Sequence, residues 1–443
     1  MNRRDFIKVS LASACGLVLP SLPGRSLAGP LDSINFDRNV YSANQAQTIM
    51  VFLYGGASEL GCNFTNYDDF KNLSETDYEY YFRSENVEAT INGFWRAAGG
   101  DIMEELLAQH DLRVFRTCFS QVRWDADNRS HGSCVAQNQR GTFHEDAPGI
   151  FANLARILYA NGQIDENTQM PFLTMDGESG FYARSNMSMV PILEPIAINE
   201  NLDNPFDRLW APAYSDHMDQ LAQARNRRLG LSAKITDAFA KRVEMKSFIQ
   251  EIKNIADPDL GNNSHGDDLN YQNNSFAHKL RTAIKILNHN PDTKVITLAT
   301  SGLGGWDDHN DADNYLRRMR DLFLALRSAM AHLKQLGRDQ TINIMVMGDF
   351  GRGVNLNSAN GWDHGNLQNF LVLGGKRYFN NSGIVGETQL DAAGSVNRLY
   401  LRPKNGSYWF EPLSIAATIY KIYGVTNPEV LTDNNPVITP LLT

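Results

Sequence analysis

Histidine and aspartate side chains follow two apolar segments of this sequence. The segment 295–300 leads into a Trp-Asp-Asp-His sequence at 306–309, and the segment 342–347 leads into Asp349 and then an Asp-His pair at 363–364. Imidazole and carboxylate groups are the ligands that zinc takes in proteins, and sites richer in carboxylates suit other divalent ions. The two segments therefore predict a metal centre or an acid–base site.

Six residues are the candidate metal ligands of this predicted centre. They are Asp307, His309, Asp349, His364, Asp363 and Glu59. Asp363, like Asp308 beside His309, could instead orient an imidazole through a hydrogen bond. Glu59 could equally be a loop carboxylate in water. A structural alternative exists for the aspartates, because aspartate forms turns and caps helices in glycine-rich loops.

The segment 128–134 supplies a second group of candidates. Ser130 precedes a predicted helix, where backbone N–H groups favour a bound anion. With a metal to lower its pKa, Ser130 could attack a phosphorus or sulfur centre, and Arg129 could clamp the anionic oxygens. The catalytic candidates are Ser130, His131 and Arg129. The alternative is that Ser130 or Ser133 is simply the N-cap of the helix.

The segments that deliver these residues have the pattern of parallel β-strands. The runs 48–54, 295–300 and 342–347 are apolar without alternation, which is typical of central parallel strands. The first run is closed by Gly55 and Gly56. In open α/β sheets, ligand sites form beyond the carboxyl ends of the strands. The candidate residues therefore lie where such a fold places its site.

The clearest helix connects the last two of these segments. Apolar residues recur at spacings of three and four from Leu316 to Leu333, Asp313 can cap the start, and Gly337 can end the helix. A strand–helix–strand crossover makes the two strands parallel. We expect the two strands to be neighbours, so that their Asp and His side chains converge.

The remaining pattern predicts one α/β domain. Further strands are predicted at 112–119, 172–175 and 370–373, and further helices at 150–158 and 413–423. This alternation predicts a mostly parallel central sheet covered by helices on both faces. We expect a single domain over residues 29–443, with insertions at about 62–95, a surface excursion, and 180–275. The polar stretch 257–275 is either a solvated connection or a mobile lid.

The first residues have the pattern of an export signal. Arg3 and Arg4 are followed by an aromatic residue and a lysine, then by a short apolar stretch and small residues up to Ala28. This predicts a twin-arginine (Tat) signal over residues 1–28, cleaved near Ala28. The apolar stretch is too short for a permanent membrane span. We expect the Tat export machinery as a partner and a periplasmic or extracellular location.

Composition excludes other classes of protein. The 443 residues are 42% hydrophobic and 21% charged, so the chain can bury a large core. The net charge is −9 and no basic patch with interleaved aromatic residues appears, so we expect no nucleic-acid partner. Cys62, Cys118 and Cys134 follow the signal, and one disulfide or three buried free thiols both stay open.

These motifs resemble those of the DUF1501 family, exported bacterial proteins within the alkaline phosphatase-like (sulfatase-like) superfamily. The resemblance rests on the twin-arginine start and on the segments 51–57, 129–131, 149–158, 305–309, 349–352, 363–366, 373–375 and 416–425. It implies an alkaline phosphatase-like fold, in which Asp and His at the ends of central strands hold divalent metals. It also implies that a Ser, Thr or modified Cys attacks a phosphate or sulfate ester. Mapped by motif, Asp307 and His309 bind one metal, Asp349 and His364 belong to the same cluster, and Ser130 lies in the nucleophile segment.

The chain departs from the family pattern at three positions. Ser58 stands where members usually carry Asp, with Glu59 next to it. Asp349 stands where Glu is usual, and Gly132 where an aromatic residue is usual. The loss of the first carboxylate argues against two metals and leaves one metal or none.

Two functions follow as hypotheses. The first is an exported metal-dependent hydrolase of phosphate or sulfate esters, acting on a small anionic ester or an envelope component. Its cofactor would be a divalent metal, with zinc as the first choice and calcium, magnesium or manganese as alternatives. The second is a non-catalytic periplasmic or cell-surface protein that keeps the fold and has lost part of the metal site.

Overall fold

The computed structural model describes most of the chain after residue 29. The described residues are 30–71, 87–176, 179–183, 195–203, 217, 220, 224, 234–300, 302–310, 312, 314–391 and 398–443. The predicted export signal lies outside them, and so do Asp313, the predicted helix cap, and parts of both predicted insertions.

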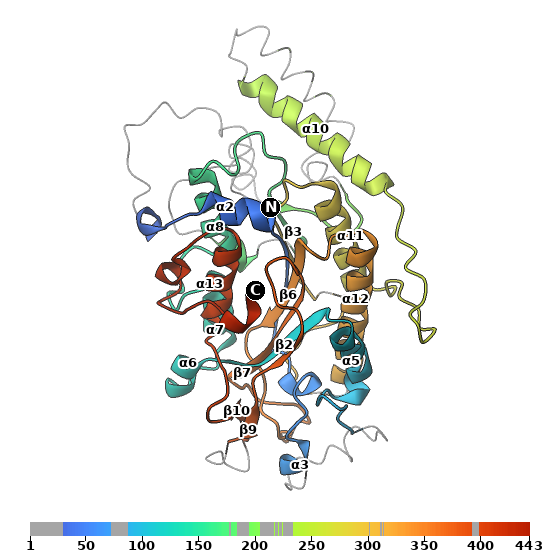
Figure 1. Cartoon of the computed structure of the whole chain (residues 1–443), viewed down its shortest axis with the longest axis vertical. Coiled ribbons are helices and arrows are strands. Elements are labelled where there is room, and N and C mark those ends of the chain that lie inside the picture. The colour runs from blue at the N-terminus through green and yellow to red at the C-terminus, as the bar shows by residue number, and fades with distance from the viewer. Residues whose placement is uncertain are drawn as a thin grey trace.

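Within the described residues, eight strands form one central sheet (Figure 1). In spatial order they are β4 (Ile196–Ala197), β3 (Phe172–Thr174), β5 (Val295–Ala299), β1 (Gln47–Leu53), β6 (Ile342–Gly348), β7 (Leu367–Gly374), β2 (Leu112–Phe119) and β8 (Gly383–Val385). Neighbouring strands are parallel except at the two edges of β7. The predicted α/β class with a mostly parallel sheet is confirmed.

Strand β1 lies between β5 and β6, the two strands predicted to be neighbours. It pairs in parallel with β5 from Thr48 to Phe52 and with β6 over its full length. The predicted parallel direction is confirmed, but the predicted adjacency is wrong. Every residue of β1 is buried, because the strand is paired along both edges and covered on both faces. Three strand ends therefore meet at the edge where the candidate ligands lie.

Strand β7 runs antiparallel because the chain turns back after β6 without a crossover helix. The connecting segment 349–366 starts and ends at the carboxyl edge of β6. The Asp-His pair at 363–364 consequently lies beside the end of β6. Gly374, at the end of β7, pairs with Asn343 at the opposite edge.

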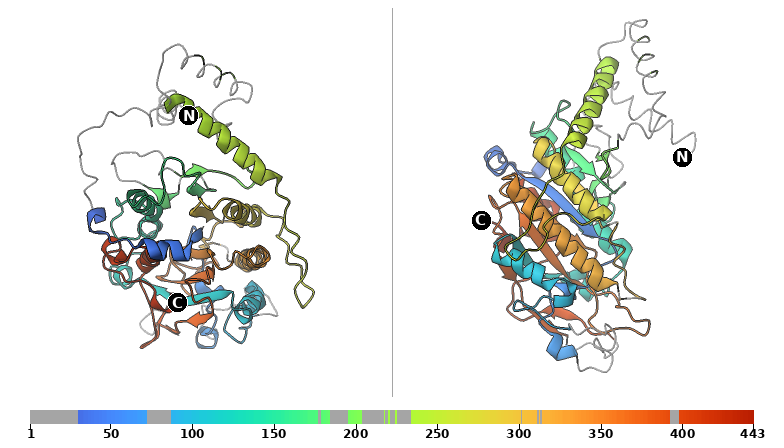
Figure 2. Two further views of the ribbon diagram at one scale, coloured as in Figure 1. Left: turned by 45° about the horizontal axis from the view of Figure 1, so that its top comes forward. Right: turned by 90° about the vertical axis from the view of Figure 1, so that its right-hand side faces the viewer.

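Helices cover both faces of the sheet (Figure 1). On one side lie α5 (Gly100–Ala108), α11 (Ser275–His289) and α12 (Tyr315–Gln335). On the other side lie α7 (His131–Arg140), α8 (Ile150–Ala160) and α13 (Leu413–Ile422). The short or peripheral elements are α2 (Arg38–Asn44), α3 (Tyr67–Phe70), α6 (Gln121–Asp125), α10 (Lys234–Asn254) and the antiparallel pair β9 (Thr388–Leu390) and β10 (Leu401–Pro403). Helix α10 projects away from the body of the fold (Figure 2).

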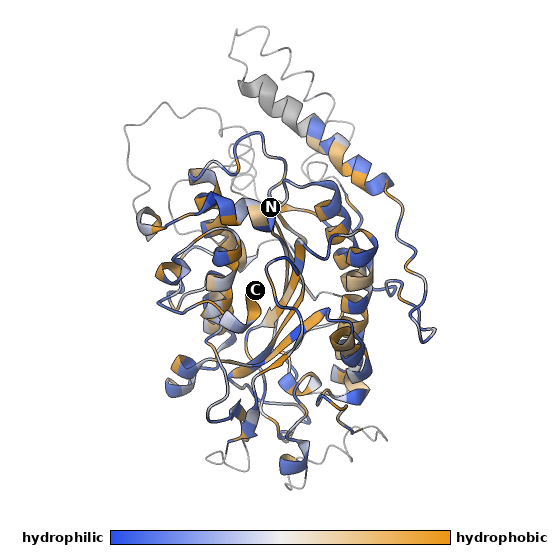
Figure 3. Cartoon of the chain, viewed as in Figure 1, coloured by the Kyte–Doolittle hydropathy of each residue, from blue (hydrophilic) through white to orange (hydrophobic). Residues whose placement is uncertain are grey.

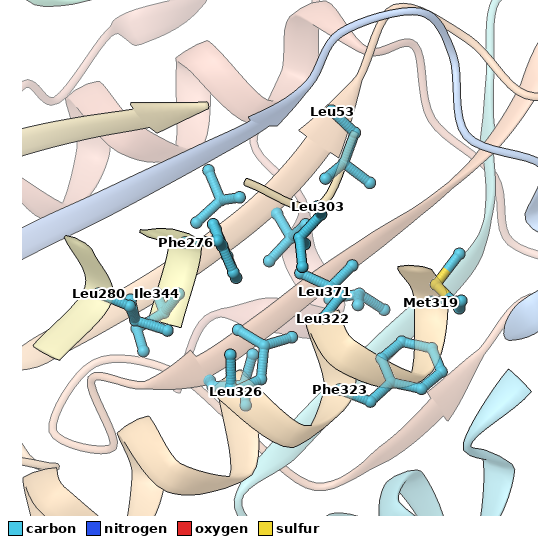
Figure 4. Packing of buried hydrophobic residues seen from close by; sticks show 14 of the residues in the cluster. Leu53, Phe276, Leu280, Leu303, Met319, Leu322, Phe323, Leu326, Ile344 and Leu371 are labelled. Atoms are coloured by element: carbon cyan, nitrogen blue, oxygen red, sulfur yellow. The ribbon is translucent and has the colours of Figure 1, made fainter. Parts of the chain in front are cut away.

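Alternate residues of the strands build two apolar cores. Ile49 and Val51 of β1 join the cluster under α11 and α12, whereas Met50 and Phe52 join the cluster under α8 and α13. Apolar residues accordingly concentrate on the sheet and on the inner sides of the helices (Figure 3). Figure 4 shows the first cluster closely, with Phe276, Leu280, Leu322, Phe323 and Leu326 from the helices and Ile344 and Leu371 from the sheet.

Helix α12 is the predicted crossover between β5 and β6. Asn314 is its N-cap, without a side-chain capping bond. Gly337 follows the end of the helix with a φ of 64°, a left-handed conformation that glycine adopts without steric cost.

The ends of segment 62–95 are part of the core. Phe64 and Trp95 are buried and stack with ring centroids 4.6 Å apart. Trp95 also contacts Tyr315 at the start of α12. The prediction that segment 62–95 lies on the surface is therefore wrong at both ends of the segment, because their aromatic side chains pack against the start of α12. Residues 72–86 lie outside the described residues.

Two further expectations concern the loop 257–275 and the cysteines. The loop is bound to α12, where Arg327 Nη2 donates to the carbonyl of Asp268 at 3.0 Å and Ser328 Oγ to that of Asn270 at 3.2 Å. These bonds favour a fixed connection over a lid.

The three cysteines that follow the predicted signal, Cys62, Cys118 and Cys134, are buried free thiols. None of the helices in the described ranges combines the length and the apolar character that a membrane crossing needs.

Candidate metal centre

Four side chains converge at the carboxyl edge of the sheet. They are His131, Asp307, His309 and His364, whose ligand atoms all lie within 4.8 Å of one another. Asp307 and His309 come from the loop after β5, His364 from the segment between β6 and β7, and His131 from the first residue of α7. Long-range packing brings together residues that lie far apart in the sequence.

The carboxylate of Asp307 is the centre of this group. Its Oδ1 atom lies 3.3 Å from Nε2 of His131 and 3.3 Å from Nε2 of His309. The distance from Oδ1 to Nε2 of His364 is 3.8 Å, and Nε2 of His309 and Nε2 of His364 are 2.7 Å apart. Three imidazole nitrogens and one carboxylate oxygen therefore point at a common position.

The outer nitrogen of each imidazole faces an oxygen. Nδ1 of His131 lies 2.8 Å from Oδ2 of Asp349, and Nδ1 of His364 lies 2.6 Å from the carbonyl oxygen of Arg129. Nδ1 of His309 lies 3.3 Å from Oδ1 of Asp363. For His131 and His364, the hydrogen-bonded acceptor at Nδ1 places the ring proton there and leaves the lone pair of Nε2 directed at the group.

The protein environment raises the pKa of His131 and lowers the pKa values of His364 and Asp307 relative to their ordinary values. The hydrogen bond to Asp349 raises the pKa of His131, although partial burial opposes it. Burial, followed by the charge of Arg352 and of the neighbouring imidazoles, lowers the pKa of His364 to about 4. His364 is therefore neutral at pH 7, with the lone pair of its Nε2 directed at Nε2 of His309, 2.7 Å away. Partial burial favours protonation of Asp307, but the hydrogen bond and charge of Arg352 hold its pKa below the ordinary value.

The side chain of Arg352 connects the loops that follow β1, β5 and β6. Its side chain is almost completely buried and donates to the carbonyl oxygens of Gly55, Gly56, Trp306 and Trp362. It also donates to Oδ1 of Asp307 at 2.7 Å. These carbonyls belong to the loops after β1, β5 and β6, so one guanidinium fixes all three loops relative to one another.

Glu59 and Ser58 lie outside the group of four. Oε2 of Glu59 accepts the backbone N–H of Arg352 at 2.8 Å, while Oε1 is buried without a hydrogen bond. Burial raises the pKa of Glu59 to about 8. The hydroxyl of Ser58 accepts the N–H of Leu60 at 3.3 Å as the cap of a short 3₁₀ turn. The end of β1 thus contributes no carboxylate to the group of four.

The predicted ligands Asp349 and Asp363 contact the imidazoles from outside the group, as described above. Asp349 also accepts the N–H of Gly55 at 3.1 Å, which fixes the carboxylate that orients His131. Asp308 pairs with Arg318 and is not one of the four side chains of the group. Of the predicted ligands, the structure therefore brings Asp307, His309 and His364 together.

The predicted nucleophile segment lies beside the group. Ser130 is the N-cap residue of α7, is exposed, and makes no side-chain capping bond. The guanidinium of Arg129 pairs with Asp127 and lies over the rings of Trp124 and Tyr400, 5.3 Å and 4.9 Å from their centroids. The contact between Arg129 and the group is made by its backbone carbonyl, not by its charge.

Two contributions to the site depend on how α7 docks against the sheet. The sequence makes His131 a catalytic candidate, but its place among the candidate ligands follows from this docking. Asn138 secures that docking, because its amide donates to the carbonyls of Gly348 at 2.8 Å and Asp349 at 2.9 Å. A buried amide in the middle of a helix is not distinguishable in sequence from any other asparagine.

The fold and the site define an α/β protein with a three-histidine, one-aspartate group that could hold a metal ion. The chain belongs to the family described as "Protein of unknown function (DUF1501)", whose model matches residues 45–399. The resemblance to this family is thereby confirmed.

Comparison with other known proteins adds little. No curated protein matches the chain. The crystal structure of the lipoteichoic acid synthase LtaP from Listeria monocytogenes aligns with 92% of this chain and 98% of its own, at 11% sequence identity and a TM-score of 0.29. A similarity at that level carries no conclusion about function.

Proposed function

We propose that this chain is an exported metal-dependent hydrolase of phosphate or sulfate esters, with zinc as the metal. The observation that carries the proposal is the oxygen facing the outer nitrogen of all three imidazoles. Metal-binding histidines usually have such a partner, which fixes the ring and strengthens the nitrogen as a ligand. In addition, Nε2 of His131 is buried and makes no hydrogen bond, so the protein itself leaves this ligand atom unsatisfied.

The donor set favours zinc over calcium or magnesium. Three imidazole nitrogens and one carboxylate oxygen match zinc, whereas calcium and magnesium prefer oxygen ligands. Two atoms bound to one tetrahedral zinc at 2.0–2.1 Å lie about 3.4 Å apart. The two 3.3 Å separations around Asp307 fit this value, whereas the 3.8 Å separation around His364 is about 0.4 Å too long and the 2.7 Å separation about 0.7 Å too short.

The residues around the group have roles in this proposal. A bound metal would polarise the ester and lower the pKa of a nearby hydroxyl. Ser130 is the proposed nucleophile, since it adjoins His131 and its hydroxyl is not used for capping. The backbone N–H groups at the start of α7 favour the anionic oxygens of the ester. Asp349 and Asp363 hold His131 and His309 in place. The proposed location, periplasmic or extracellular, rests on the twin-arginine pattern.

A second candidate is a non-catalytic envelope protein that keeps the fold. The position of Arg352 favours it, because the guanidinium donates at 2.7 Å to the same Asp307 oxygen that faces the imidazoles. A cation of the protein itself thus already neutralises the single carboxylate of the group. Ser58 in place of a carboxylate also favours this candidate.

Metal analysis of the purified protein separates the two candidates. After expression in zinc-replete medium we expect about one equivalent of zinc per chain, falling below about a tenth in His364→Ala. The matched control is His144→Ala, because the His144 side chain is 82% exposed and lies outside the group. A wild-type protein with only traces of any divalent metal contradicts the first candidate and supports the second.

Turnover tests the chemistry separately from the metal. The zinc-loaded protein should hydrolyse 4-nitrophenyl phosphate or 4-nitrophenyl sulfate, and Ser130→Ala should lose this activity while it keeps its zinc. Absence of turnover on both esters by the loaded protein would argue for the non-catalytic candidate.

A further inference from the structure

Arg116, on β2, is a buried cation with no carboxylate beside it. Its side chain is 6% exposed. Nε donates to the carbonyl of Cys62 at 2.6 Å, Nη2 donates to the carbonyl of Asn92, and the guanidinium lies over the Phe94 ring, 5.4 Å from its centroid. Within the described part of the chain, Nη1 makes no hydrogen bond and no Asp or Glu oxygen lies within 4 Å of Arg116.

This arrangement is unfavourable without a further partner. A charge taken out of water needs an opposite charge or a full set of hydrogen bonds. Of the other buried arginines in the described residues, Arg318, Arg327 and Arg352 each have a carboxylate within 4 Å. Arg123 has no such carboxylate but donates from Nε and Nη2 to the side-chain oxygens of Gln137 and Asn138, whereas the hydrogen bonds of Arg116 to described residues go to main-chain carbonyls alone. Burial lowers the pKa of Arg116 to about 10, so the side chain remains charged at neutral pH. Among the described residues Arg116 is therefore a positive charge with no carboxylate in direct contact; Glu104, which binds Asn92, attracts it from a greater distance.

Arg116 lines a pocket of about 940 Å³. The pocket lies between the segment 87–93, the end of β8 and the turn after β10, and none of its lining residues belongs to the metal centre. Six of its fifteen lining residues carry a hydroxyl or an amide side chain, namely Thr65, Thr90, Asn92, Asn405, Ser407 and Tyr408, and Ala89, Ile91 and Ile384 add apolar surface. An ion pair between Lys404 and Glu387, 2.9 Å long, lies on its exposed rim.

We propose that this pocket binds a sugar-sized ligand that carries a carboxylate or a phosphate, and that Arg116 is the counter-charge of its anionic group. The unused N–H groups of a guanidinium form a planar fork that matches two oxygens of either anion. The hydroxyls and amides of the lining suit a hydroxylated body, and a volume of several hundred cubic ångströms is typical of small-molecule sites. The polar lining disfavours a lipid tail or a fatty acid.

Titration calorimetry on the full chain tests this proposal with three probes. They are digalacturonate for a carboxylate, glucose 6-phosphate for a phosphate, and maltose as the neutral control. We expect saturable binding of at least one anionic probe, at least about tenfold tighter than maltose because the buried cation is engaged only by an anion. The anionic probe that binds identifies the group that the pocket takes. Binding of neither anionic probe overturns the proposal.

Two variants place the binding in the pocket. Arg116→Gln removes the charge, and Asn405→Trp fills the pocket from an exposed turn without changing the contacts of Arg116. Each should weaken binding by about tenfold or more, whereas the exposed control Arg317→Gln should not change it. If Arg116→Gln does not fold, Asn405→Trp decides alone. Full affinity in Asn405→Trp overturns the proposal.

Treatment with the chelator EDTA distinguishes binding in this pocket from binding at the metal centre. Binding in the pocket should persist after EDTA treatment, because Arg116 needs no metal. Loss of binding on chelation would assign the anion to the metal centre and overturn the proposal. The result is independent of whether the chain is a hydrolase.

Discussion

Replacing Glu59 by glutamine should remove a specific pH dependence from the stability of the protein. Glu59 is buried, and burial raises its pKa from the ordinary 4.5 to about 8. The native state therefore keeps the proton until about pH 8, whereas the unfolded state releases it near pH 4.5. The unfolded state binds fewer protons between these values, so the free energy of unfolding falls as the pH rises, by about 1.4 kcal/mol for each pH unit.

The magnitude follows from this window. Between pH 5 and pH 8 the contribution amounts to about 4 kcal/mol. Glutamine resembles the neutral carboxyl in shape and cannot titrate. We therefore expect Glu59→Gln to match the wild type near pH 5 and to be more stable than the wild type by about 4 kcal/mol at pH 8.

Urea unfolding followed by tryptophan fluorescence measures this difference at each pH unit from 5 to 8. EDTA should be present throughout, so that metal binding does not add its own pH dependence. Glu387→Gln is the control, because that side chain is 73% exposed, pairs with a lysine and should leave the curve parallel to the wild type. A constant difference between Glu59→Gln and the wild type over the whole range would show that Glu59 is ionised in the fold. The charge of Arg352 would then outweigh the cost of burial.

Two further predictions concern the loops around the metal centre. Arg352→Met should lower the free energy of unfolding by at least about 4 kcal/mol, because it leaves four buried carbonyls and Asp307 without their hydrogen-bond donor. In calorimetry this corresponds to a fall in Tm of about 5 °C for a chain of this length, and a fall no larger than that of the exposed variant Arg317→Met would contradict it. Gly361→Ala should destabilise by about 1–3 kcal/mol or more, since its Cβ would lie 2.1 Å from the carbonyl oxygen of Asp308. Gly305→Ala, with nothing within 4 Å of its Cβ, should stay within about 0.5 kcal/mol in guanidinium unfolding, and equal effects of the two changes would refute the steric explanation.

The strands and the crossover helix could be predicted because their signals are local. The unbroken apolar run of β1, its glycine end, and the spacing of apolar residues in α12 each specify one element. The order of the strands could not be predicted in the same way. Strands β5 and β6 pair with the two edges of β1, and this pairing depends on packing between residues more than two hundred positions apart. Strand β7 runs antiparallel because no helix follows β6.

The candidate site was predictable where residue type and strand end coincide. Asp307, His309 and His364 follow strands and join the group. Asp349 also follows a strand, yet it contacts His131 instead, because α7 places an imidazole between this carboxylate and the other ligands. The sequence carries no local trace of the amide of Asn138 that docks the helix. Likewise, the burial of Glu59 follows from the closure of the loops over it.

The partners of Arg352 have a consequence for how this site can change. Four of them are main-chain carbonyls, of Gly55, Gly56, Trp306 and Trp362, and every amino acid carries that group. Exposed side chains elsewhere in these loops can therefore be exchanged without loss of an anchor. The exposed side chains of these loops can change while the backbone contacts of Arg352 stay the same. Related chains could therefore acquire new specificities on an unaltered scaffold. Engineering of the site should accordingly begin with the exposed loop positions and leave the arginine untouched.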